Sequence, residues 1–565
     1  MLEKISRKQP YLKKAFKHGI FPLLFYLLIF CLLTYPLILK FFTHYFTDTG
    51  DGLQNIWNLW WVNTVVLRPN TYPSIWQTNL LHWPFGTTLY GQTLNPFNGY
   101  LAVFLLRFLT LTSTFNTITI FTFVMGGVTM YWLAYYLTRS FWGSIIAGFI
   151  FTFSSYHFSH VAEHLQLISL EWIPLFILIW YILTVKPGVL TGACAAIVFW
   201  LVLLCDYYYF FYIILTAILI VLWYAIFNKK AWFILEKKYI IPLATFLVIA
   251  FLLTGPILSS LVISNIRDPL QGFHHPITFS LDLLSLFIPG NHWIFNQWTE
   301  FFWSKLPGNI NENSVFLPLT VFIIPGYLLA KRKQLELFTK QQILLWLVTA
   351  GVFFLLALGP AFHFGGKIIW DKYMPYTLLV HVLPVLNLSG VPVRMMVIVT
   401  LSASILSAFG FQELFRQLPK KKVIIFFLLG LILFETLIKP LPTTRIEVPD
   451  YVTALAGLPN DGGVVDLVTS GESLPLYYQT IHHKPIVFGY VSRLPKSVGE
   501  ADLVLAQTIE DQDYGLLWDK YHIRYILTQD LIQPQELPQF ISIATVYDKN
   551  DIRIYRIGCK CEEDK

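Results

Sequence analysis

Long apolar segments recur along this chain and constrain its fold more than any other feature. Eleven of them approach or exceed the roughly 20 residues that a membrane-spanning helix requires, at 20–42, 114–137, 141–155, 166–184, 188–205, 207–227, 239–260, 313–330, 342–360, 393–413 and 423–439. The shortest, 141–155, spans only with help from its flanks. Charged residues make up 13% of the sequence, against about 25% in average soluble domains. We therefore predict a polytopic α-helical membrane protein with about eleven transmembrane helices.

The positions of Lys and Arg predict how these helices are oriented. With a cytoplasmic N-terminus, nearly every basic cluster of the membrane region falls in an inner connection, at Arg139, Lys186, 229–238, 331–340 and 416–422. Short cytoplasmic loops carry such an excess of positive charge. If 97–112 also crossed, these clusters would lie outside, so we predict that 97–112 is an interfacial helix on the outer surface. The net charge of +7 reflects this topology, and no nucleic-acid partner is expected.

The N-terminus predicts a first helix that stays in place. Residues 1–18 are strongly basic, and no small-residue cleavage site follows the apolar segment after them. This pattern is typical of an uncleaved anchor rather than of a signal peptide. We expect a multi-pass protein of the cell (plasma) membrane with a cytoplasmic N-terminus. Its long outer segments, 43–113, 261–312 and 361–392, are aromatic and hold most of the unusual polar residues, so function is expected on the outer face.

The sequence changes character near Leu441. From there to Lys565 the charge density is ordinary, and helix-like pieces separate the β-like runs GVVDL, KPIVFGY, IRYILTQ, ISIATVYD and IRIYRI. This alternation predicts a small α/β domain. We divide the chain into a transmembrane catalytic domain, 1–440, and an extracytoplasmic soluble α/β domain, 441–565. Cys559 and Cys561 in the tail are a weak metal or redox signal.

Two carboxylates stand at the start of the first outer segment, in FTDTGDGLQNIWNLWW (46–61). Asp51 precedes an amphipathic, Trp-rich helix at the membrane surface. Partial burial there would raise its pKa toward the range of a general base. The alternative is that Asp51 caps a helix beginning at Leu53. Asp48 is the rival or helper, and Gln54 is expected to hydrogen-bond a hydroxyl-rich ligand or to lie on a solvated face.

A second polar cluster, SSYHFSHVAEHLQLISLEW, covers 154–172. On a helix, His160, Glu163 and His164 would share one face. Imidazoles with a carboxylate bind a divalent metal, and they also contact a substrate or a phosphate. A third possibility is an interfacial cap without a chemical role.

Four further residues on the outer side are candidate substrate contacts. Asp206 lies in CDYYYFFY, where it lines a cavity or caps a turn. His292 belongs to the long outer loop, and Glu312 opens a span that it could cap. Arg394, in LNLSGVPVRMMVIV, has apolar neighbours at the mouth of a span. A buried Arg is costly unless it binds a carboxylate, a phosphate or lipid headgroups.

These features together resemble the GT-C superfamily of polyprenyl-phosphate-dependent membrane glycosyltransferases. GDGLQNIWNLWW, TLNPFNGYLA, EHLQLISLEWIP, VPVR and YYQTIHHKPIVFGYVSR resemble more closely a bacterial and archaeal branch of it. The resemblance implies that Asp51, or else Asp48, is the base acting on the acceptor, that 160–164 occupies the second-loop motif, and that Arg394 binds phosphate. The usual D-x-D spelling is absent, so no cofactor is certain and a divalent metal is possible.

The implied function is an inverting transfer of a sugar from a polyprenyl-phosphate-linked donor to an acceptor hydroxyl on the outer face. The acceptor is a glycan, a lipid or a protein, and membrane lipids are the other partners. Two alternatives belong to other classes. A lipid or glycan transporter or flippase would carry charged groups in the middle of its spans, and a non-catalytic envelope assembly protein would tolerate the loss of Asp51 and of the His cluster.

Overall fold

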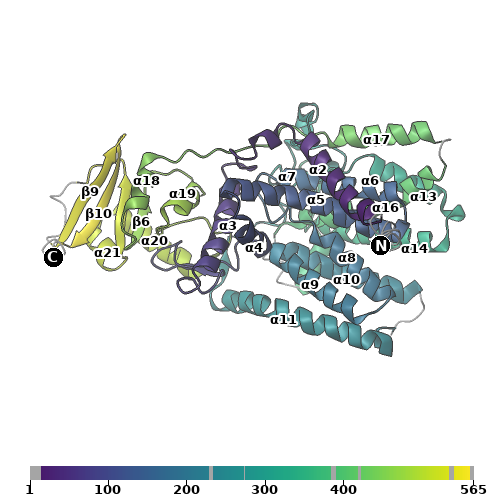
Figure 1. Cartoon of the computed structure of the whole chain (residues 1–565), viewed down its shortest axis with the longest axis horizontal. Coiled ribbons are helices and arrows are strands. Elements are labelled where there is room, and N and C mark those ends of the chain that lie inside the picture. The colour runs from purple at the N-terminus through teal and green to yellow at the C-terminus, as the bar shows by residue number, and fades with distance from the viewer. Residues whose placement is uncertain are drawn as a thin grey trace, which may run out of the picture. The chain divides into compact units, whose positions relative to one another are not determined.

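The chain forms two compact units. The computed structural model describes residues 14–227, 233–272, 274–382, 390–417, 421–471, 473–532 and 540–559 (Figure 1). Unit 1 comprises 1–42, 116–256 and 273–442, and unit 2 comprises 43–115, 257–272 and 443–565. Residues 1–13, 386–389 and Cys561, together with parts of the connections 229–238 and 416–422, lie outside the described residues.

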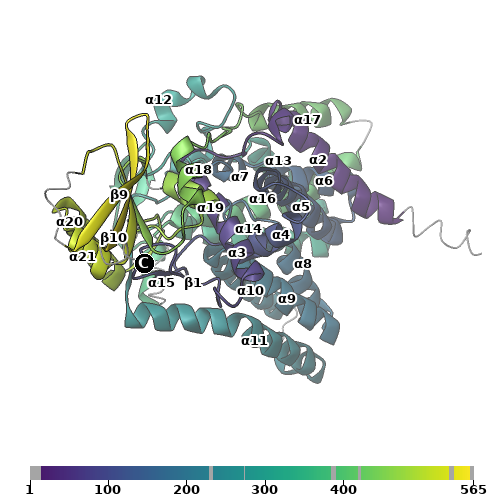
Figure 2. The same cartoon turned by 60° about the vertical axis from the view of Figure 1, so that its left-hand side comes forward.

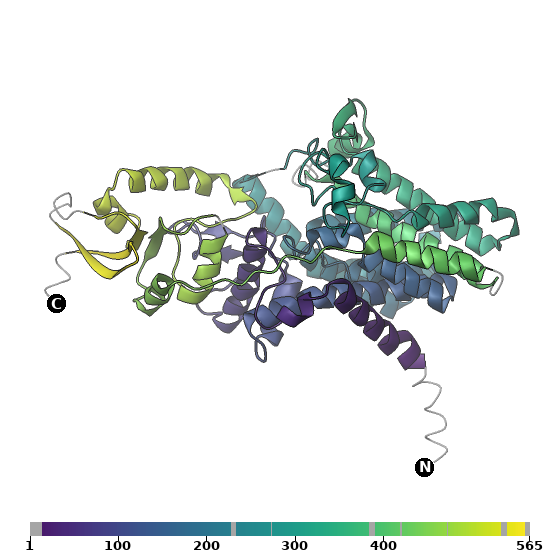
Figure 3. The same cartoon turned by 90° about the horizontal axis from the view of Figure 1, so that it is seen from above.

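Unit 1 is helical, and a helix overlaps each of the eleven predicted segments. Its helices run roughly side by side (Figures 1 and 3). They are α2 (Phe21–Leu33), α5 (Leu111–Thr138), α6 (Phe141–Thr152), α7 (Ser155–His160), α8 (Trp172–Val185), α9 (Val189–Cys205), α10 (Tyr207–Phe227), α11 (Lys237–Arg267), α12 (Glu300–Trp303), α13 (Thr320–Ala330), α14 (Leu337–Ala357), α15 (Pro375–Val382), α16 (Met396–Phe415) and α17 (Lys422–Thr436).

Six helical segments are long and apolar enough to cross a membrane. They are Phe16–Leu33, Leu111–Thr138, Tyr207–Phe227, Lys237–Arg267, Leu337–Ala357 and Pro392–Phe415. Two helices are shorter than their predicted apolar segments: α2, which belongs to the first of these six, ends at Leu33, three residues before Pro36, and α13 begins only at Thr320. Proline disfavours helical backbone at the residue before it, which fits an early end of α2. The count of eleven crossings and the orientation of the chain stay predictions.

Helix α16 is the centre of unit 1. Seventeen of its residues are buried, and it packs against α6, α13 and α14. Small side chains allow this close approach. A Cβ atom at Gly410, for example, would collide with the side chain of Ile324. The buried hydroxyls of Thr400 and Ser404 donate to backbone carbonyls one turn earlier, so the helix buries polar residues without leaving these two unsatisfied.

Unit 2 contains a four-stranded mixed sheet in the order β6-β8-β10-β9. The strands are β6 (Gly463–Asp466), β8 (Ile523–Thr528), β9 (Ile541–Lys549) and β10 (Ile552–Cys559), with β6 parallel to β8 and the other pairs antiparallel. Asn550 and Asp551 both have positive φ in the β9–β10 turn, as a two-residue hairpin requires. Figure 2 shows β9 and β10 side by side. The predicted strand KPIVFGY forms only a bridge, between Ile486 and Val464.

The helices of unit 2 come from the N-terminal and the C-terminal parts of the chain. They are α3 (Asp51–Leu67), α4 (Pro96–Leu105), α18 (Asp450–Gly457), α19 (Leu474–His482), α20 (Lys496–Glu510) and α21 (Tyr514–Asp519). The unit that holds 443–565 thus also includes 43–115 and 257–272, which the predicted boundary at 441 leaves out. Phe104 and Phe108 are exposed at and just beyond the end of α4, in the segment predicted to lie on the membrane surface.

Helix α3 differs from its prediction as an amphipathic surface helix. Every residue from Gly52 to Val62 is buried. The rings of Trp57 and Trp61 stack at 5.7 Å, and their Nε1–H groups donate to Gln479 Oε1 (2.7 Å) and to the backbone oxygen of Ile75 (3.0 Å). Since Gln479 belongs to α19, a segment more than 400 residues later covers the face expected to meet solvent or lipid.

Candidate active site

Arg394 lies in the short helix Pro392–Met395 that leads into α16, and only 4% of it is exposed. Its Nε atom lies 3.1 Å from both carboxylate oxygens of Glu312, and Nη2 also donates to Oε1. A fork of this kind matches the planar carboxylate and is among the strongest side-chain pairs. The alternative in which Arg394 reaches out to lipid headgroups is therefore wrong, because a carboxylate neutralises it inside the unit.

Glu312 joins Arg394 to the His cluster. It lies in a turn at 311–313, ahead of α13, so the expectation that it opens and caps a span is wrong. Its Oε2 atom is 3.2 Å from Nε2 of His160, the last residue of α7. Burial alone would raise the pKa of Glu312, but the charges of Arg394 and His160 hold that pKa well below its usual value. Glu312 is therefore an anion between two donors.

His160 is completely buried, and acceptors face both of its ring nitrogens. Nδ1 is 2.7 Å from the backbone oxygen of Tyr156, and Nε2 meets the Glu312 carboxylate. His160 thus links α7 to the buried ion pair of Arg394 and Glu312.

Asp206 and Tyr208 lie next to this cluster. The guanidinium carbon of Arg394 is 4.8 Å from the centre of the Tyr208 ring, a cation–π distance. Asp206 Oδ1 accepts from the backbone N–H groups of Tyr208 (2.7 Å) and Tyr209 (3.2 Å), so Asp206 caps α10. Burial raises the pKa of Asp206 to about 7, while Arg394 acts in the opposite direction. Of its two predicted roles, the structure bears out the cap.

Glu163 and His164 lie beyond the end of α7 at His160, so the three residues do not belong to one helix, but the rings of His160 and His164 still lie 5.7 Å apart and Glu163 Oε2 is 3.7 Å from His164 Nδ1. Glu163 also accepts from Asn311 Nδ2 at 2.6 Å, so the turn that carries Glu312 also holds this segment. Burial lowers the pKa of His164 to about 3, which keeps its ring neutral. Among the described residues, no group of three or more His, Cys, Asp or Glu is arranged to hold a metal ion.

His292 stays outside this hydrogen-bonded cluster. Its backbone oxygen accepts from the backbone N–H of Lys439 (2.9 Å), and burial lowers its pKa to about 3. In the described part of the chain, its Nδ1 atom has no hydrogen-bond partner. Its role as a substrate contact stays a prediction.

The two acids of the first outer segment belong to unit 2. Helix α3 begins at Asp51 with Gly50 as its N-cap, so the alternative that Asp51 caps a helix starting at Leu53 is wrong. The side chain of Asp48, two residues before this N-cap, supports the start of the helix, since its Oδ1 accepts from the backbone N–H groups of Gly50 (3.1 Å) and Gly52 (3.3 Å). Burial raises the pKa of Asp48, and these two bonds partly offset the shift.

Gln54 is not on a solvated face. It is 2% exposed, donates to Ser492 Oγ at 3.4 Å and accepts from Thr93 Oγ1 at 3.4 Å. Both bonds tie α3 to other segments of unit 2, so Gln54 supports the unit's own packing.

Sequence reasoning missed Tyr208 and Asn311 as members of the site in unit 1. Tyr208 follows Asp206 in CDYYYFFY, and Asn311 precedes Glu312 in NINENS. Closeness in sequence to these two predicted site residues was the signal that could have identified them.

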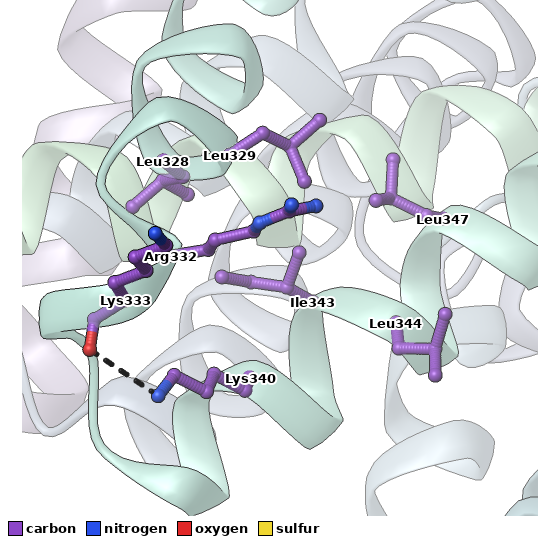
Figure 4. A pocket seen from close by; sticks show the side chains of 8 residues that line it. All are labelled: Leu328, Leu329, Arg332, Lys333, Lys340, Ile343, Leu344 and Leu347. Carbon is purple, nitrogen blue, oxygen red and sulfur yellow. Dashed lines mark hydrogen bonds between the residues drawn. The ribbon is translucent and has the colours of Figure 1, made fainter.

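A separate cavity of about 360 Å³ lies in unit 1 between α13 and α14. Figure 4 shows leucine and isoleucine side chains on its walls with Arg332, Lys333 and Lys340 beside them. These cations belong to the predicted inner cluster 331–340. None of the predicted site residues lines this cavity, so it does not contribute to the site around Arg394.

Comparison with solved structures decides the fold. The chain is similar to the arabinofuranosyltransferase AftD from Mycobacteria, with 13% identity, a TM-score of 0.50, and coverage of 94% of this chain and 41% of that one. The chain has the GT-C fold. This chain spans less than half the length of AftD. The predicted resemblance is confirmed at the level of the fold.

Two other GT-C structures are more distant. The oligosaccharyltransferase AglB from Archaeoglobus fulgidus, in complex with an inhibitory peptide and a dolichol-phosphate, has 14% identity, a TM-score of 0.44, and coverage of 92% of this chain and 70% of that one. ArnT from Cupriavidus metallidurans, bound to undecaprenyl phosphate, has 11% identity, a TM-score of 0.39, and coverage of 93% and 97%. No family model and no curated protein match the sequence.

Proposed function

We propose that this protein is a membrane glycosyltransferase that moves a sugar from a polyprenyl-phosphate-linked donor to an acceptor hydroxyl on the outer face of the membrane. The GT-C fold supports a glycosyltransferase. The buried cluster of Arg394, Glu312 and His160 is the observation that carries the proposal, because it places a charged guanidinium and its carboxylate partner inside an apolar helical unit. Such a charge is costly in a membrane protein without a function that uses it.

The cluster is suited to a phosphate group. Glu312 occupies the Nε and Nη2 donors of Arg394 and fixes the plane of the guanidinium, which leaves Nη1 for a phosphate oxygen. His160 Nε2 also meets the Glu312 carboxylate, so Arg394 shares that carboxylate with a second side chain. Preorganised donors of this kind stabilise the charge that develops on a leaving group. Glu312 and His160 are thus positioning residues for Arg394, the residue proposed to touch the lipid phosphate.

Asp51 is the proposed base. In a single displacement, the acceptor oxygen forms a bond to the anomeric carbon while the bond from that carbon to the phosphate oxygen breaks. The bonding electron pair leaves with the lipid phosphate, the acceptor proton passes to the Asp51 carboxylate, and the anomeric configuration inverts. Asp51 stands in the first turn of α3 and is only partly buried, so an acceptor hydroxyl can approach its carboxylate. Asp48 is committed to two backbone N–H groups. The Asp51 and Arg394 assignments concern different units and are tested separately.

The test is a transfer assay with reconstituted protein and a panel of undecaprenyl-phosphate-linked hexoses and pentoses. We expect the wild type to release undecaprenyl phosphate as it transfers sugar. Arg394→Lys keeps a partner for Glu312 but loses the fork, and we expect transfer to fall by about 10²–10³-fold. The matched control is Asp519→Asn, an exposed residue at the end of α21. Movement of the lipid-linked sugar across the membrane without transfer would instead favour a flippase.

A further inference from the structure

Unit 2 holds a cavity of about 460 Å³ at the carboxyl end of β6. Val464 and Asp466 of β6 line it together with Thr469 and residues of the segment 486–494. The bridge between Val464 and Ile486 is parallel, so two parallel chain segments end at this cavity. Ligands of α/β proteins bind at the carboxyl ends of parallel strands. The volume falls within the range of about 300–1,000 Å³ that is usual for small-molecule sites.

The cavity accounts for a stretch of sequence that the proposed active site leaves unused. In YYQTIHHKPIVFGYVSR, the run from Ile486 to Val491 lines the cavity wall. His482 is buried and His483 stacks on Trp60, so neither lines the cavity. Phe488 is 40% exposed, and its ring and that of Tyr490 supply aromatic surface to the cavity.

The surroundings of His82 indicate that the cavity binds a ligand. Only 4% of it is exposed, and it lines the cavity. Its Nδ1 atom is 2.6 Å from Asp502 Oδ2, so Nδ1 carries the proton that the carboxylate accepts. Its buried Nε2 atom has no hydrogen-bond partner among the described residues. Buried polar atoms are nearly always paired, and a ligand hydroxyl would satisfy this one.

Asp466 provides the second polar contact. Its Oδ1 atom accepts from the backbone N–H groups of Val468 (3.0 Å) and Thr469 (2.9 Å), which fixes the carboxylate at the end of β6. Because both bonds use Oδ1, Oδ2 can accept a hydrogen bond from a ligand. The carboxylate is thus held in place before any ligand arrives.

The charges of the cavity define the chemical class of the ligand. Among the described residues that line it, none is Lys or Arg. Asp466 at the wall and Asp502 behind His82 would repel a phosphate or another anion. Acceptors that favour hydroxyl donors, set beside aromatic rings, suit a neutral polyhydroxylated ring. We propose that this cavity binds a neutral sugar unit of the acceptor glycan. The assignment of this sugar to the acceptor rests on the proposed function, whereas sugar binding itself does not.

The direct test is saturation-transfer NMR and calorimetry on the full-length protein in detergent. The probes are glucose, galactose, mannose, N-acetylglucosamine and their neutral disaccharides. We expect at least one of them to bind, and we expect Asp466→Asn and His82→Gln to weaken its binding at least about tenfold, since each alters a group proposed to hydrogen-bond the sugar. Phe488→Ala, at a partly exposed position, is a variant whose fold is not at risk, and it should weaken binding as well.

Asp519→Asn in the same unit is the matched control and should bind like the wild type. If no probe binds, or if Asp466→Asn and Phe488→Ala both bind with wild-type affinity while their unfolding temperatures are unchanged, the proposal is overturned.

Transfer kinetics separate this proposal from the proposed function. We expect Asp466→Asn to raise the KM for acceptor with little change in the KM for donor, and Arg394→Lys to lose transfer while it still binds the sugar probe. If wild-type protein transfers nothing but binds the probe at this cavity, the proposed function fails and the sugar site stands. An active enzyme whose acceptor KM is unaffected by Asp466→Asn would contradict the assignment of this sugar to the acceptor.

Discussion

The site around Arg394 in unit 1 and the cavity at His82 in unit 2 both bury ionisable side chains, but they treat them in opposite ways. Arg394, Glu312 and His160 satisfy one another around a buried guanidinium. The cavity has a fixed carboxylate, an imidazole nitrogen without a partner among the described residues, and no cation on its described walls. The first arrangement favours an anion and the second a neutral hydroxyl-rich ligand. A transferase that joins a lipid phosphate donor to a sugar acceptor needs both chemistries.

The largest expected effect comes from removing the charge of Arg394. Arg394→Met leaves the Glu312 carboxylate buried without its main partner, which costs about 3–5 kcal/mol of stability. The double variant Arg394→Met/Glu312→Met should recover most of that stability, because it removes both charges. We expect both variants to lose sugar transfer. Thermal unfolding in detergent and the transfer assay measure the two effects; a double variant that regains transfer with its stability would show that the cluster is only structural.

The next largest effect is expected at Asp51. A general base contributes about 10²–10⁴-fold to a reaction rate, so Asp51→Asn should reduce transfer by that factor. The fold should be retained, since Asp51 is only partly buried and α3 is held by its tryptophans. Donor binding should not change. Near-normal turnover of the Asn variant would remove Asp51 from the mechanism.

A smaller effect is expected at Asp48, the other acid of the same turn. Asp48→Ala removes the acceptor of two backbone N–H groups and should cost about 1 kcal/mol, as the loss of a helix cap does. Asp48→Asn retains an acceptor oxygen and should cost little. Unfolding by denaturant compares the two. If Asp48→Asn abolished transfer while Asp51→Asn did not, the roles of the two acids would be exchanged.

The smallest effect is a change in pH dependence. Because burial raises the pKa of Asp48 above its value in the unfolded chain, the folded state binds this proton more tightly. The corresponding stability is present below the unfolded pKa and declines as pH rises through the folded pKa. Asp48→Asn should therefore show a shallower decline than wild type over this acidic range. Equal slopes would mean that Asp48 has the same proton affinity in both states.

The sequence was a good guide to the helices and a poor one to their partners. Apolar length located a helix in every predicted segment, because backbone hydrogen bonds within a membrane must be satisfied inside each helix. The sequence also indicated that Arg394 needs an anion. It did not identify Glu312, which lies 82 residues away in the chain and follows no periodic spacing.

Unit 2 was harder to predict for the same reason. Helix α3 looks amphipathic on its own, but α19 buries it through a contact between Trp57 and Gln479, 422 residues apart. The hydrogen-bonded residues His82 and Asp502 are likewise 420 residues apart, so no local sequence pattern connects them. At 160–164 only the helical conformation was wrong: α7 ends at His160 and Asn311 donates a hydrogen bond to Glu163 in the turn that follows, while the rings of His160 and His164 remain neighbours.

The central claim is that Arg394 and its partners hold the phosphate of a lipid-linked donor. Native mass spectrometry of the full-length protein, with equal amounts of undecaprenyl phosphate and undecaprenol, tests it most directly. We predict that wild type retains the phosphate in clear preference to the alcohol and that Arg394→Lys reduces this preference at least about tenfold, because Lys lacks the planar fork. Equal retention of the two lipids by wild type, or an unchanged preference in the variant, would contradict the account.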